Sequence, residues 1–592
     1  MAEQDINKKL GTEEVLWDLN DLYFSVHDPQ IDDDISVCVQ EASAIKEKYS
    51  GQLHSLSSSK LKSLVDRLEK LEQRLSKLAT FAFLNFATRL QDAEASAFLQ
   101  KIKETSSTIG TETIFFELEW CKLNADQALP LLEDEELSHF RHHLENIRRY
   151  TDHLLSSVEE TLLLKKAPVG SSSWTTLFEK VFGHLKFGEN KRSEEEVLAD
   201  LYNPNRDSRK QAADDLTSGL QEQLHILTHI FNTLLADKMI SDDLRQYPSW
   251  VSTMNLNNEI HDRTVTTLIE SVTSRYDIVQ RYYCLKKELL GLDELNDYDR
   301  YAPLPSLPKD LTSWSECRET VISGFREFSP KMAEIASFFF DRNWIHAPVL
   351  DGKRGGAFAH PCVPGVHPYV LVNYTGNMRD VSTVAHELGH GVHQYLAAQG
   401  GYYNSKTPLV LAETASVFAE LLIFHNQLKS LSDNSAQQKA FICQKLESIF
   451  ATVFRQVAMN RFEEKVHTAR RESGELSSSK FATLWLETQK EMFGDSVILT
   501  ENYSVWWSYI PHFLHSPGYV YSYAFGELLV LSLYNLYIQE GDAFVPKYIE
   551  LLSQGGSLSP YELLTPFGVD LDDKQFWLGG LKIIDDMLQR IE

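Results

Sequence analysis

The sequence predicts a mainly α-helical protein that also carries one small β-sheet. Apolar residues recur three and four positions apart over most of the chain, which is the period of an α-helix with one buried face. One stretch, 351–375, departs from this pattern, because it is rich in glycine and proline and holds two short runs of β-prone residues. With 592 residues, 43% of them hydrophobic, the chain can bury a large core.

The first third of the chain predicts long helices. Six leucines between residues 61 and 78 alternate three and four positions apart, the seam of a helix in a bundle or a coiled-coil hairpin. We assign this seam to core packing rather than to a partner surface, and further helical patterns follow it. The sequence therefore predicts an N-terminal helical, coiled-coil-like region over 1–190 and a second region over 191–592 that carries the chemistry.

The charge composition narrows the possible partners. The 84 acidic residues outnumber the 57 basic ones and give a net charge of -27, whereas nucleic acid binding relies on basic surface, so nucleic acid is not expected as a partner. The N-terminus shows no basic and apolar leader and no apolar run approaches about 20 residues, so we expect no membrane segment and a cytoplasmic location. The six cysteines lie far apart without Cys-x-x-Cys, which fits reduced thiols.

Two strands are expected in the stretch that breaks the helical pattern. Residues 368–374 read as one strand and residues 357–359 as a shorter one. The edge of such a sheet can pair with an extended peptide backbone whatever its side chains, which makes Tyr369 a candidate substrate contact. A purely structural hairpin is the alternative.

A helix is predicted over 381–398, with Asp380 as its N-cap. Gly389 and Gly391 oppose this prediction, since each costs about 1 kcal/mol relative to alanine inside a helix. We therefore expect a packed helix or a substrate backbone to approach closely at these glycines. The apolar residues that recur at helical spacing are Val381, Val384, Ala385, Leu388 and Val392.

This helix carries the pattern His-Glu-x-x-His. Residues four apart share one face of a helix, so His386 and His390 can bind one metal ion through imidazole nitrogens about 2.0–2.1 Å from it. Glu387 can reach a zinc-bound water without being a ligand and act as general base in the attack on a peptide carbonyl. His386 and His393 are separated by a rise of about 10.5 Å along the helix, so one ion cannot bind both. We therefore expect His393 to contact the ligands or to pack in the core. An ordinary helix with two histidines is the alternative.

A zinc ion in a catalytic site takes a third protein ligand and keeps one position for water. A second helix is predicted to begin at Thr407 and Pro408, and Glu413 and Glu420 lie two turns apart on it, beside a stripe of small residues. We assign Glu413 as the third ligand and Glu420 as the acceptor of a hydrogen bond from a ligand imidazole. Two solvated glutamates on an exposed edge are the alternative.

Histidine and tyrosine gather beside glycine and proline near the C-terminal end. Such side chains can donate hydrogen bonds to the oxyanion that forms during peptide hydrolysis. His512 is the first candidate donor, followed by Tyr519 and Tyr523, while Gly518 and Tyr521 are candidates for substrate binding. Tyrosines two positions apart cannot all share one helix face, so at least one is expected to pack inside.

Six separated segments, in order along nearly the whole chain, form a recognisable set: 17–22, 290–304, 381–393, 411–416, 511–513 and 518–523. Together they resemble the oligoendopeptidase F branch of the thimet-oligopeptidase family of zinc metallopeptidases. The resemblance implies a prolate helical zincin with a deep substrate channel, the metal at its bottom, the small sheet along one wall and the region 1–190 forming part of the wall. It also implies one zinc ion per chain and short peptides as substrates, because a narrow channel excludes folded proteins.

The resemblance matches individual positions of this sequence to family roles. His386 and His390 correspond to the ligand histidines, Glu387 to the base and Glu413 to the ligand glutamate. His512 and the segment 519–523 correspond to the oxyanion-stabilising and substrate-binding segment.

The sequence thus predicts a cytoplasmic zinc-dependent endopeptidase that hydrolyses internal bonds of oligopeptides. A helical zinc carboxypeptidase is the nearest rival, and it needs a partner for the terminal carboxylate of its substrate, for which Arg354 is the candidate. A non-catalytic peptide-binding protein on the same fold is the other rival. A base beside a metal ligand argues against it, because a binding protein has no use for one.

Overall fold

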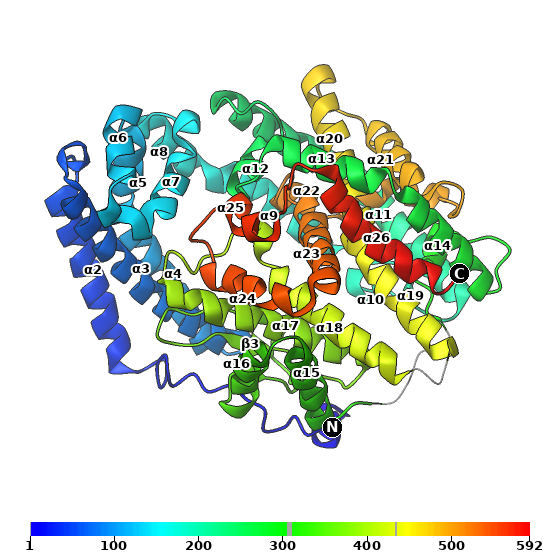
Figure 1. The fold of residues 1–592 in the computed structure, drawn as a ribbon. Helices are drawn as coiled ribbons and strands as arrows, with labels where there is room; N and C mark the ends of the chain where they lie inside the picture. The colour runs from blue at the N-terminus through cyan, green and yellow to red at the C-terminus, as the bar shows by residue number, and fades with distance from the viewer. Residues whose placement is uncertain (1, 305–310, 432–434) are drawn as a thin grey trace. The chain divides into compact units, whose positions relative to one another are not determined.

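The computed structural model describes residues 2–304, 311–431 and 435–592, and helices dominate the chain (Figure 1). The sheet formed by the described residues has three short strands. The predicted mainly helical fold with a small sheet is therefore confirmed. The prolate outline and the deep channel stay predictions.

Contacts within the chain divide it into two compact units, and each unit is assembled from three separate stretches. Unit 1 comprises Met1–Thr151, Pro308–Ser432 and Leu536–Val569, and unit 2 comprises Asp152–Leu307, Asp433–Asn535 and Asp570–Glu592. The division predicted at residue 190 stays a prediction.

Unit 1 contains the three strands of the sheet and helices from each of its three stretches. Its elements are α1 (Ala2–Leu10), α2 (Pro29–Tyr49), α3 (Ser58–Ala87), α4 (Ala93–Thr113), α5 (Phe115–Lys122), α6 (Ala125–Leu132), α7 (Arg141–Arg148), α15 (Trp314–Phe328), α16 (Pro330–Asp341), β1 (Ile345–His346), β2 (Phe358–His360), β3 (Tyr369–Leu371), α17 (Met378–Ala397), α18 (Thr414–Ser430), α24 (Phe544–Gln554) and α25 (Pro560–Leu564).

Unit 2 is helical throughout its described part, apart from isolated bridges. Its helices are α8 (Ser157–Lys166), α9 (Ser171–His184), α10 (Glu194–Asp200), α11 (Arg206–Leu244), α12 (Ser252–Asn257), α13 (Asp262–Thr273), α14 (Tyr276–Leu289), α19 (Ser435–Thr452), α20 (Phe454–Ser473), α21 (Ser478–Phe493), α22 (His512–His515), α26 (Lys574–Gln589) and the larger part of α23 (Tyr521–Glu540).

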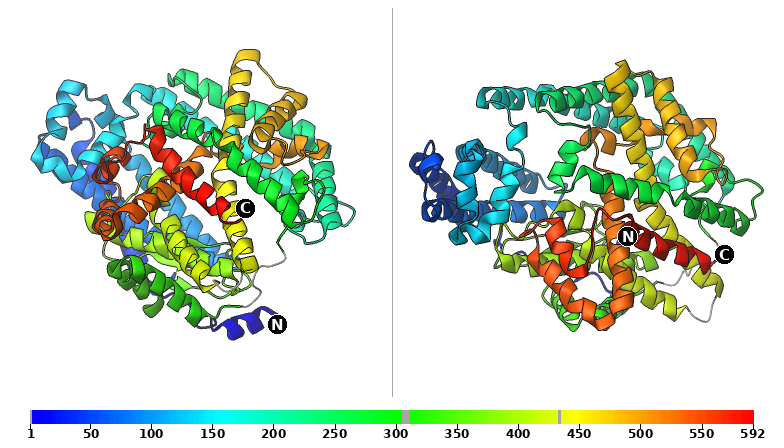
Figure 2. Two further views of the ribbon diagram at one scale, coloured as in Figure 1. Left: turned by 45° about the vertical axis from the view of Figure 1, so that its right-hand side comes forward. Right: turned by 45° about the horizontal axis from the view of Figure 1, so that its top comes forward.

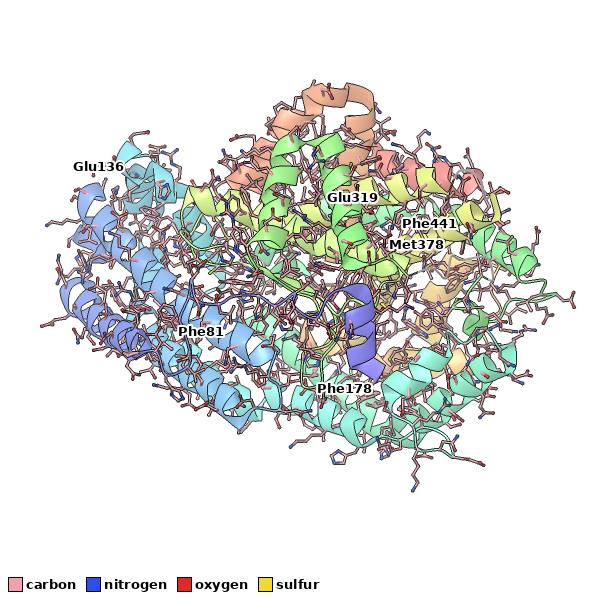
Figure 3. All side chains as sticks on the ribbon, turned by 90° about the horizontal axis from the view of Figure 1, so that it is seen from below. Phe81, Glu136, Phe178, Glu319, Met378 and Phe441 are labelled. Atoms are coloured by element: carbon pink, nitrogen blue, oxygen red, sulfur yellow. The ribbon has the colours of Figure 1, made fainter. Side chains whose placement is uncertain are left out.

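Helix α3 realises the predicted leucine seam. Ser57 caps it, since its side chain accepts a hydrogen bond from the backbone N–H of Lys60. Five of the six leucines are buried, and α3 packs between α2 and α4, so the seam faces the core as predicted. Figure 3 labels Phe81 on this helix, with Met378 at the first residue of α17.

The sheet lies directly ahead of α17 in the sequence and packs on that helix. Its strand order is β1-β3-β2, with β1 parallel and β2 antiparallel to β3. The central strand β3 is fully buried, whereas all three residues of β2 keep partial exposure. Strand β3 falls inside the strand predicted over 368–374, β2 is displaced by one residue from the one predicted over 357–359, and β1 was not predicted.

The segment before α17 is tied together by one buried lysine. The Nζ of Lys353 donates to the carbonyl oxygens of His346, Pro348 and Val372 at 3.2, 2.7 and 2.6 Å. Burial lowers the pKa of this ammonium group to about 7. The three bonds join the residues around β1 and β3 and so brace the sheet.

In unit 2 the core forms around α11, α20 and α21. Aromatic rings fill it, with Phe231, Phe481 and Trp507 in mutual contact and Trp485 fully buried. This core supports the segment that leads into α22 and α23.

One stretch of the described residues, Leu409–Ser430, is long and apolar enough to cross a membrane, with a mean hydropathy of 1.3. The sequence analysis expected no such run. Most of it is α18, which lies side by side with α17 (Figures 1 and 2), and 67% of the window is buried. Packing against α17 therefore accounts for its apolar character.

Candidate active site

Helix α17, which carries the His-Glu-x-x-His pattern, begins earlier than predicted. Asn377 is its N-cap, because its side chain accepts from the N–H of Asp380. Asp380 lies in the first turn, where its carboxylate accepts from the N–H and the hydroxyl of Thr375. The prediction of Asp380 as N-cap was therefore wrong: both residues suit the position, and the sequence alone does not rank them.

The glycines of α17 mark two close approaches, as predicted. A Cβ at Gly389 would lie 2.5 Å from the backbone oxygen of Ala415 and 2.6 Å from Cα of Ser416, both at the start of α18. A Cβ at Gly391 would lie 2.5 Å from the ring of Phe339 on α16. The absence of these side chains lets α18 pack directly on the helix that bears the histidines.

Three side chains from α17 and the start of α18 converge. The Oε2 of Glu413 lies 3.4 Å from Nε2 of His386 and 3.4 Å from Nε2 of His390, and the ligand-type atoms of the three residues all lie within 4.8 Å of one another. Burial disfavours a charge on Glu413, but the hydrogen bond and charges of the two histidines lower its pKa to about 2. The group can thus present two imidazole nitrogens and one carboxylate to a cation.

Helix α18 starts later than predicted. Residues Leu409–Leu411 form a short 3-10 turn and the α-helix begins at Thr414, so Glu413 itself occupies the N-cap position. The prediction of Thr407 as N-cap was wrong at this point. Ser416 fixes the glutamate by donating from its hydroxyl to Oε2 of Glu413 at 2.6 Å. Sequence reasoning counted Ser416 only as a small residue and missed this role.

Glu420 and His393 lie next to this group. The Oε1 of Glu420 lies 2.5 Å from Nδ1 of His386. Burial alone would lower the pKa of His386, but the bond to Glu420 and the neighbouring carboxylates raise it to about 9. His393 is buried with Nε2 3.4 Å from the hydroxyl of Thr407, and burial lowers its pKa to about 3, so it stays neutral.

Glu387 points toward the sheet. It is buried, and burial raises the pKa of its carboxyl group, although the two imidazoles and the nearby backbone N–H of Ala359 oppose this rise. Ala359 is the middle residue of β2, and its carbonyl oxygen accepts from Gln394 of α17 at 3.4 Å. Sequence reasoning predicted this strand but not that it lies beside the glutamate, because no motif links the two segments.

In unit 2, His512 and two tyrosines form a second group. The Nε2 of His512 on α22 lies 3.2 Å from the hydroxyl of Tyr523, and the ring of Tyr523 meets that of Tyr519 edge-on at 5.0 Å. All three side chains keep partial exposure. Burial, then the charges of His515 and Arg455, lower the pKa of His512, so its imidazole is neutral at pH 7.

Three predicted substrate contacts are occupied inside the protein. Tyr521 is fully buried and its hydroxyl accepts from Asn258 at 2.8 Å. The N–H of Gly518, a residue with φ +82, donates to Glu463 at 2.9 Å. Tyr369 lies on the central strand and is fully buried against Trp17 and His367. The structure thus leaves neither tyrosine ring open to a substrate.

The chain is similar to known peptidases over most of its length. The sequence profile of peptidase family M3 matches residues 199–583, and that of oligopeptidase F matches residues 119–187. Oligopeptidase PepF of Bacillus subtilis is 27% identical over 575 residues, which cover 93% of this chain and 84% of that protein. An oligoendopeptidase F homolog of Lactococcus lactis is 25% identical over 599 residues, with 99% and 98% covered.

Solved structures share the fold. A crystal structure of a Chlamydophila abortus protein matches with a TM-score of 0.87 at 24% identity and 98% coverage of both chains. Oligoendopeptidase F of Enterococcus faecium matches with a TM-score of 0.71 at 20% identity, covering 95% of this chain and 98% of that one. The resemblance seen in the sequence is confirmed: the chain belongs to peptidase family M3, a family of metallopeptidases, as an oligopeptidase of the oligoendopeptidase F type.

Proposed function

We propose that this chain is a zinc-dependent endopeptidase that hydrolyses internal peptide bonds of short oligopeptides. One observation carries the proposal. Two imidazoles and the Glu413 carboxylate converge on one point, and Glu387 lies on the same helix between the two histidines. A metal group and a buried carboxylate side by side are the two components that metal-assisted hydrolysis requires.

The donor set fits a zinc ion. Ligand atoms held at 2.0–2.1 Å from a tetrahedral ion lie about 3.4 Å apart, which agrees with the 3.4 Å between Glu413 and each histidine. Nδ1 of His386 donates to Glu420, so Nε2 is the nitrogen left for an ion, and its proton has to leave first because the carboxylates raise the pKa of this imidazole to about 9. A zinc ion held by His386, His390 and Glu413, one per chain, supplies Lewis acidity that lowers the pKa of water to about 7.

Glu387 serves as the general base in this proposal. Its carboxylate takes a proton from the attacking water and returns it to the leaving amine. The backbone N–H of Ala359 lies near enough to favour the ionised form of this carboxylate, as do the two imidazoles.

His512 and Tyr523 are proposed as hydrogen-bond donors to the oxyanion, with Tyr519 as the third candidate. A neutral imidazole and two phenols can donate without carrying charge into the site. The support from the structure is that His512 and Tyr523 lie 3.2 Å apart and both keep partial exposure.

Strand β2 is proposed to bind the substrate backbone. The strand order makes β2 the edge next to α17, and its residues keep partial exposure, so an extended peptide can pair with it as a further strand. Pairing of this kind uses hydrogen bonds to the peptide backbone rather than contacts with side chains, so it suits peptides of varied sequence. It replaces the role predicted for Tyr369.

We also propose a cytoplasmic location, with peptides as partners and neither nucleic acid nor membrane among them. The six cysteines support it, because all are free in the described part of the chain, as reduced thiols in the cytoplasm are. The net charge of -27 argues against nucleic acid.

The test is hydrolysis of an internally quenched peptide of about ten residues, blocked at both ends, with products identified by mass spectrometry. We expect internal cuts that vanish with a chelator and return with zinc. If blocked peptides resist and unblocked ones lose C-terminal residues, the carboxypeptidase replaces the endopeptidase. Binding of peptides without any cleavage indicates the non-catalytic alternative.

The structure gives the carboxypeptidase no specific support. Its candidate anchor, Arg354, is exposed, and its guanidinium lies 5.5 and 5.8 Å from the ring centroids of Phe83 and Phe358.

A further inference from the structure

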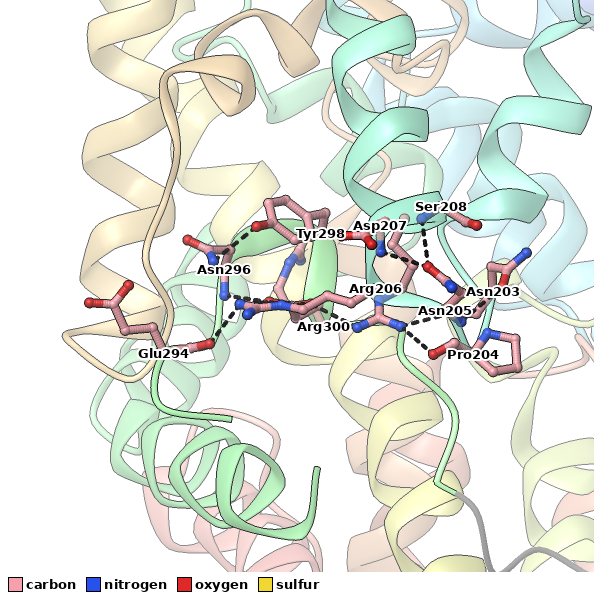
Figure 4. A network of polar contacts seen from close by, with 12 residues as sticks. Asn203, Pro204, Asn205, Arg206, Asp207, Ser208, Glu294, Asn296, Tyr298 and Arg300 are labelled. Atoms are coloured by element: carbon pink, nitrogen blue, oxygen red, sulfur yellow. Dashed lines mark hydrogen bonds and ion pairs between the residues drawn. The ribbon is translucent and has the colours of Figure 1, made fainter. Parts of the chain in front are cut away.

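The turn at 297–301 has no role in the function proposed above, although it belongs to the segment 290–304 that resembles the family. It is held firmly in unit 2. The buried carboxylate of Asp299 accepts from Arg206 and Arg209, each at 2.8 Å. Figure 4 shows the surrounding network, which reaches from Arg206 across the turn to Arg300. A turn anchored this way fixes the side chains that follow it.

Arg300 brings a buried positive charge behind Tyr301. It is 3% exposed, and its Nε donates to the backbone oxygen of Asp297 at 2.9 Å. The guanidinium lies 4.9 and 5.0 Å from the ring centroids of Tyr301 and Tyr503. Among the described residues no carboxylate lies within ion-pair distance of it, and burial raises the pKa of the nearby Asp297, which weakens its negative charge.

Arg455, on α20, adds a second positive charge beside the same phenol. Its Nη1 donates to the hydroxyl of Tyr301 at 3.1 Å, while its Nε is buried without a partner. The side chain is partly exposed, and no carboxylate in the described part of the chain occupies its donors.

The two arginines dominate the local electrostatics. Burial raises the pKa of Tyr301, yet the charges of Arg300 and Arg455 outweigh burial and lower it below its usual value. The charge of Arg455 also contributes, after burial and His515, to the lowered pKa of His512. In a chain with a net charge of -27, this is an uncommon place where the local field favours an anion.

We propose that Arg455 and the hydroxyl of Tyr301 form an anion subsite that binds a carboxylate of the peptide substrate. The inference rests on the proposed function, since it takes the peptide from there. A guanidinium presents its N–H groups in a planar fork that matches the two oxygens of a carboxylate. The carboxylate comes either from the C-terminus of the peptide or from an aspartate or glutamate side chain.

The test compares three quenched peptides that differ only near the C-terminal end. One has a free C-terminus with Gln at the variable position, one has an amidated C-terminus with Glu there, and one is amidated with Gln and so carries no carboxylate. We expect at least one carboxylate peptide to exceed the neutral one tenfold or more in kcat/KM. A higher kcat/KM for the free-acid peptide means that the subsite binds the C-terminal carboxylate. A higher kcat/KM for the Glu peptide means that it binds the side-chain carboxylate.

Arg455→Met is expected to reduce this preference to twofold or less, chiefly through KM. Arg461→Met is the matched control, because Arg461 lies on the same helix and already pairs with Glu464 at 2.6 Å. It should keep the full preference. Arg455→Lys keeps a positive charge and should retain part of it, which separates loss of the subsite from a folding defect.

Binding of the same peptides, with fluorescent labels, to the zinc-loaded Glu387→Gln variant gives a readout without turnover. The subsite predicts tighter binding of the carboxylate peptide, lost on adding Arg455→Met. If the wild-type chain cuts none of the peptides, the proposed function fails, and this binding preference still decides the subsite. No preference in the wild type, or the same preference in Arg455→Met and Arg461→Met, overturns the inference.

Discussion

The two units hold their reactive side chains by different means. In unit 1, His386 and His390 stand on a long helix pressed against α18 where Gly389 offers no side chain. In unit 2, His512 stands on a single turn, and the loop after it is held by hydrogen bonds to buried polar groups such as Glu463. Helix packing places the first group, whose side chains are then oriented by Ser416 and Glu420, whereas hydrogen bonds hold the loop of the second. A change in volume should therefore damage the first group more than the second.

The largest effect is expected at Glu387, the proposed base. Glu387→Gln keeps the shape of the side chain and removes its ability to take a proton. We expect kcat to fall by about 10²–10⁴-fold, with one zinc ion per chain retained by elemental analysis. A variant with near wild-type kcat removes Glu387 from the role of base.

His512→Ala probes the group in unit 2. Loss of one oxyanion donor is expected to lower kcat by about 10²–10³-fold, with a smaller change in KM. Steady-state kinetics on the blocked peptide measures both. A larger rise in KM than fall in kcat makes His512 a binding residue instead. Tyr523→Phe keeps the ring and tests the partner hydroxyl in the same way.

Glu420→Ala tests whether a residue that only orients the proposed ligand His386 affects zinc binding. Without the acceptor 2.5 Å from Nδ1 of His386, the imidazole loses its fixed orientation. We expect zinc affinity to fall by about 10–100-fold, measured by competition with a chelator of known affinity. Unchanged affinity means that packing alone orients His386, which sharpens the contrast between the units.

Gly389→Ala tests packing directly. The added methyl group meets backbone atoms of α18 at 2.5–2.6 Å, so we expect a loss of about 1–3 kcal/mol in the free energy of unfolding. Gly110→Ala is the control, since Gly110 lies in α4 with open space around it and alanine should be neutral or stabilising by up to about 1 kcal/mol. Equal denaturation midpoints for the two variants contradict the close contact.

Glu463→Gln tests the hydrogen-bonded group through pH. Burial raises the pKa of Glu463 from the usual 4.5 to about 8, despite the bond from Gly518 and the charge of Lys238. Between these values the folded chain holds a proton that the unfolded chain has released, so this group costs stability as pH rises, by up to about 1.4 kcal/mol per pH unit. Glutamine does not titrate.

The melting temperature of Glu463→Gln should therefore improve relative to wild type from pH 5.5 to pH 8, at fixed ionic strength. Parallel curves for the two proteins show that Glu463 titrates normally in the folded state.

The sequence alone predicted the features that depend on the spacing of residues along a single helix. The spacing of His386 and His390 and the carboxylates at 413 and 420 follow from residues on two helices, and the structure brings these side chains together. Helix starts were mispredicted where two suitable caps compete, as at Asn377 and Asp380. The roles of buried tyrosines depend on partners far away in the sequence, and no period in the sequence marks them.

Arg455 illustrates the limit most clearly. It stands 154 positions from Tyr301 on an ordinary helix, with nothing around it in the sequence to distinguish it from other arginines. Only the folded chain brings it to the phenol. Motifs therefore located the metal group, whereas the cationic subsite required the tertiary structure.

The assembly of unit 1 from three stretches has a consequence for its synthesis. Helix α24, in the last stretch, packs on α17, and Tyr548 donates to the backbone oxygen of Thr414, 134 positions earlier. At roughly 5–20 residues per second, a ribosome needs about 7–27 s to travel from one to the other. During that interval α17 and the start of α18 exist without α24, which later packs on α17. Nascent chains that stop before Tyr548 should therefore expose apolar surface of α17 and α18 and become targets for chaperones and proteases.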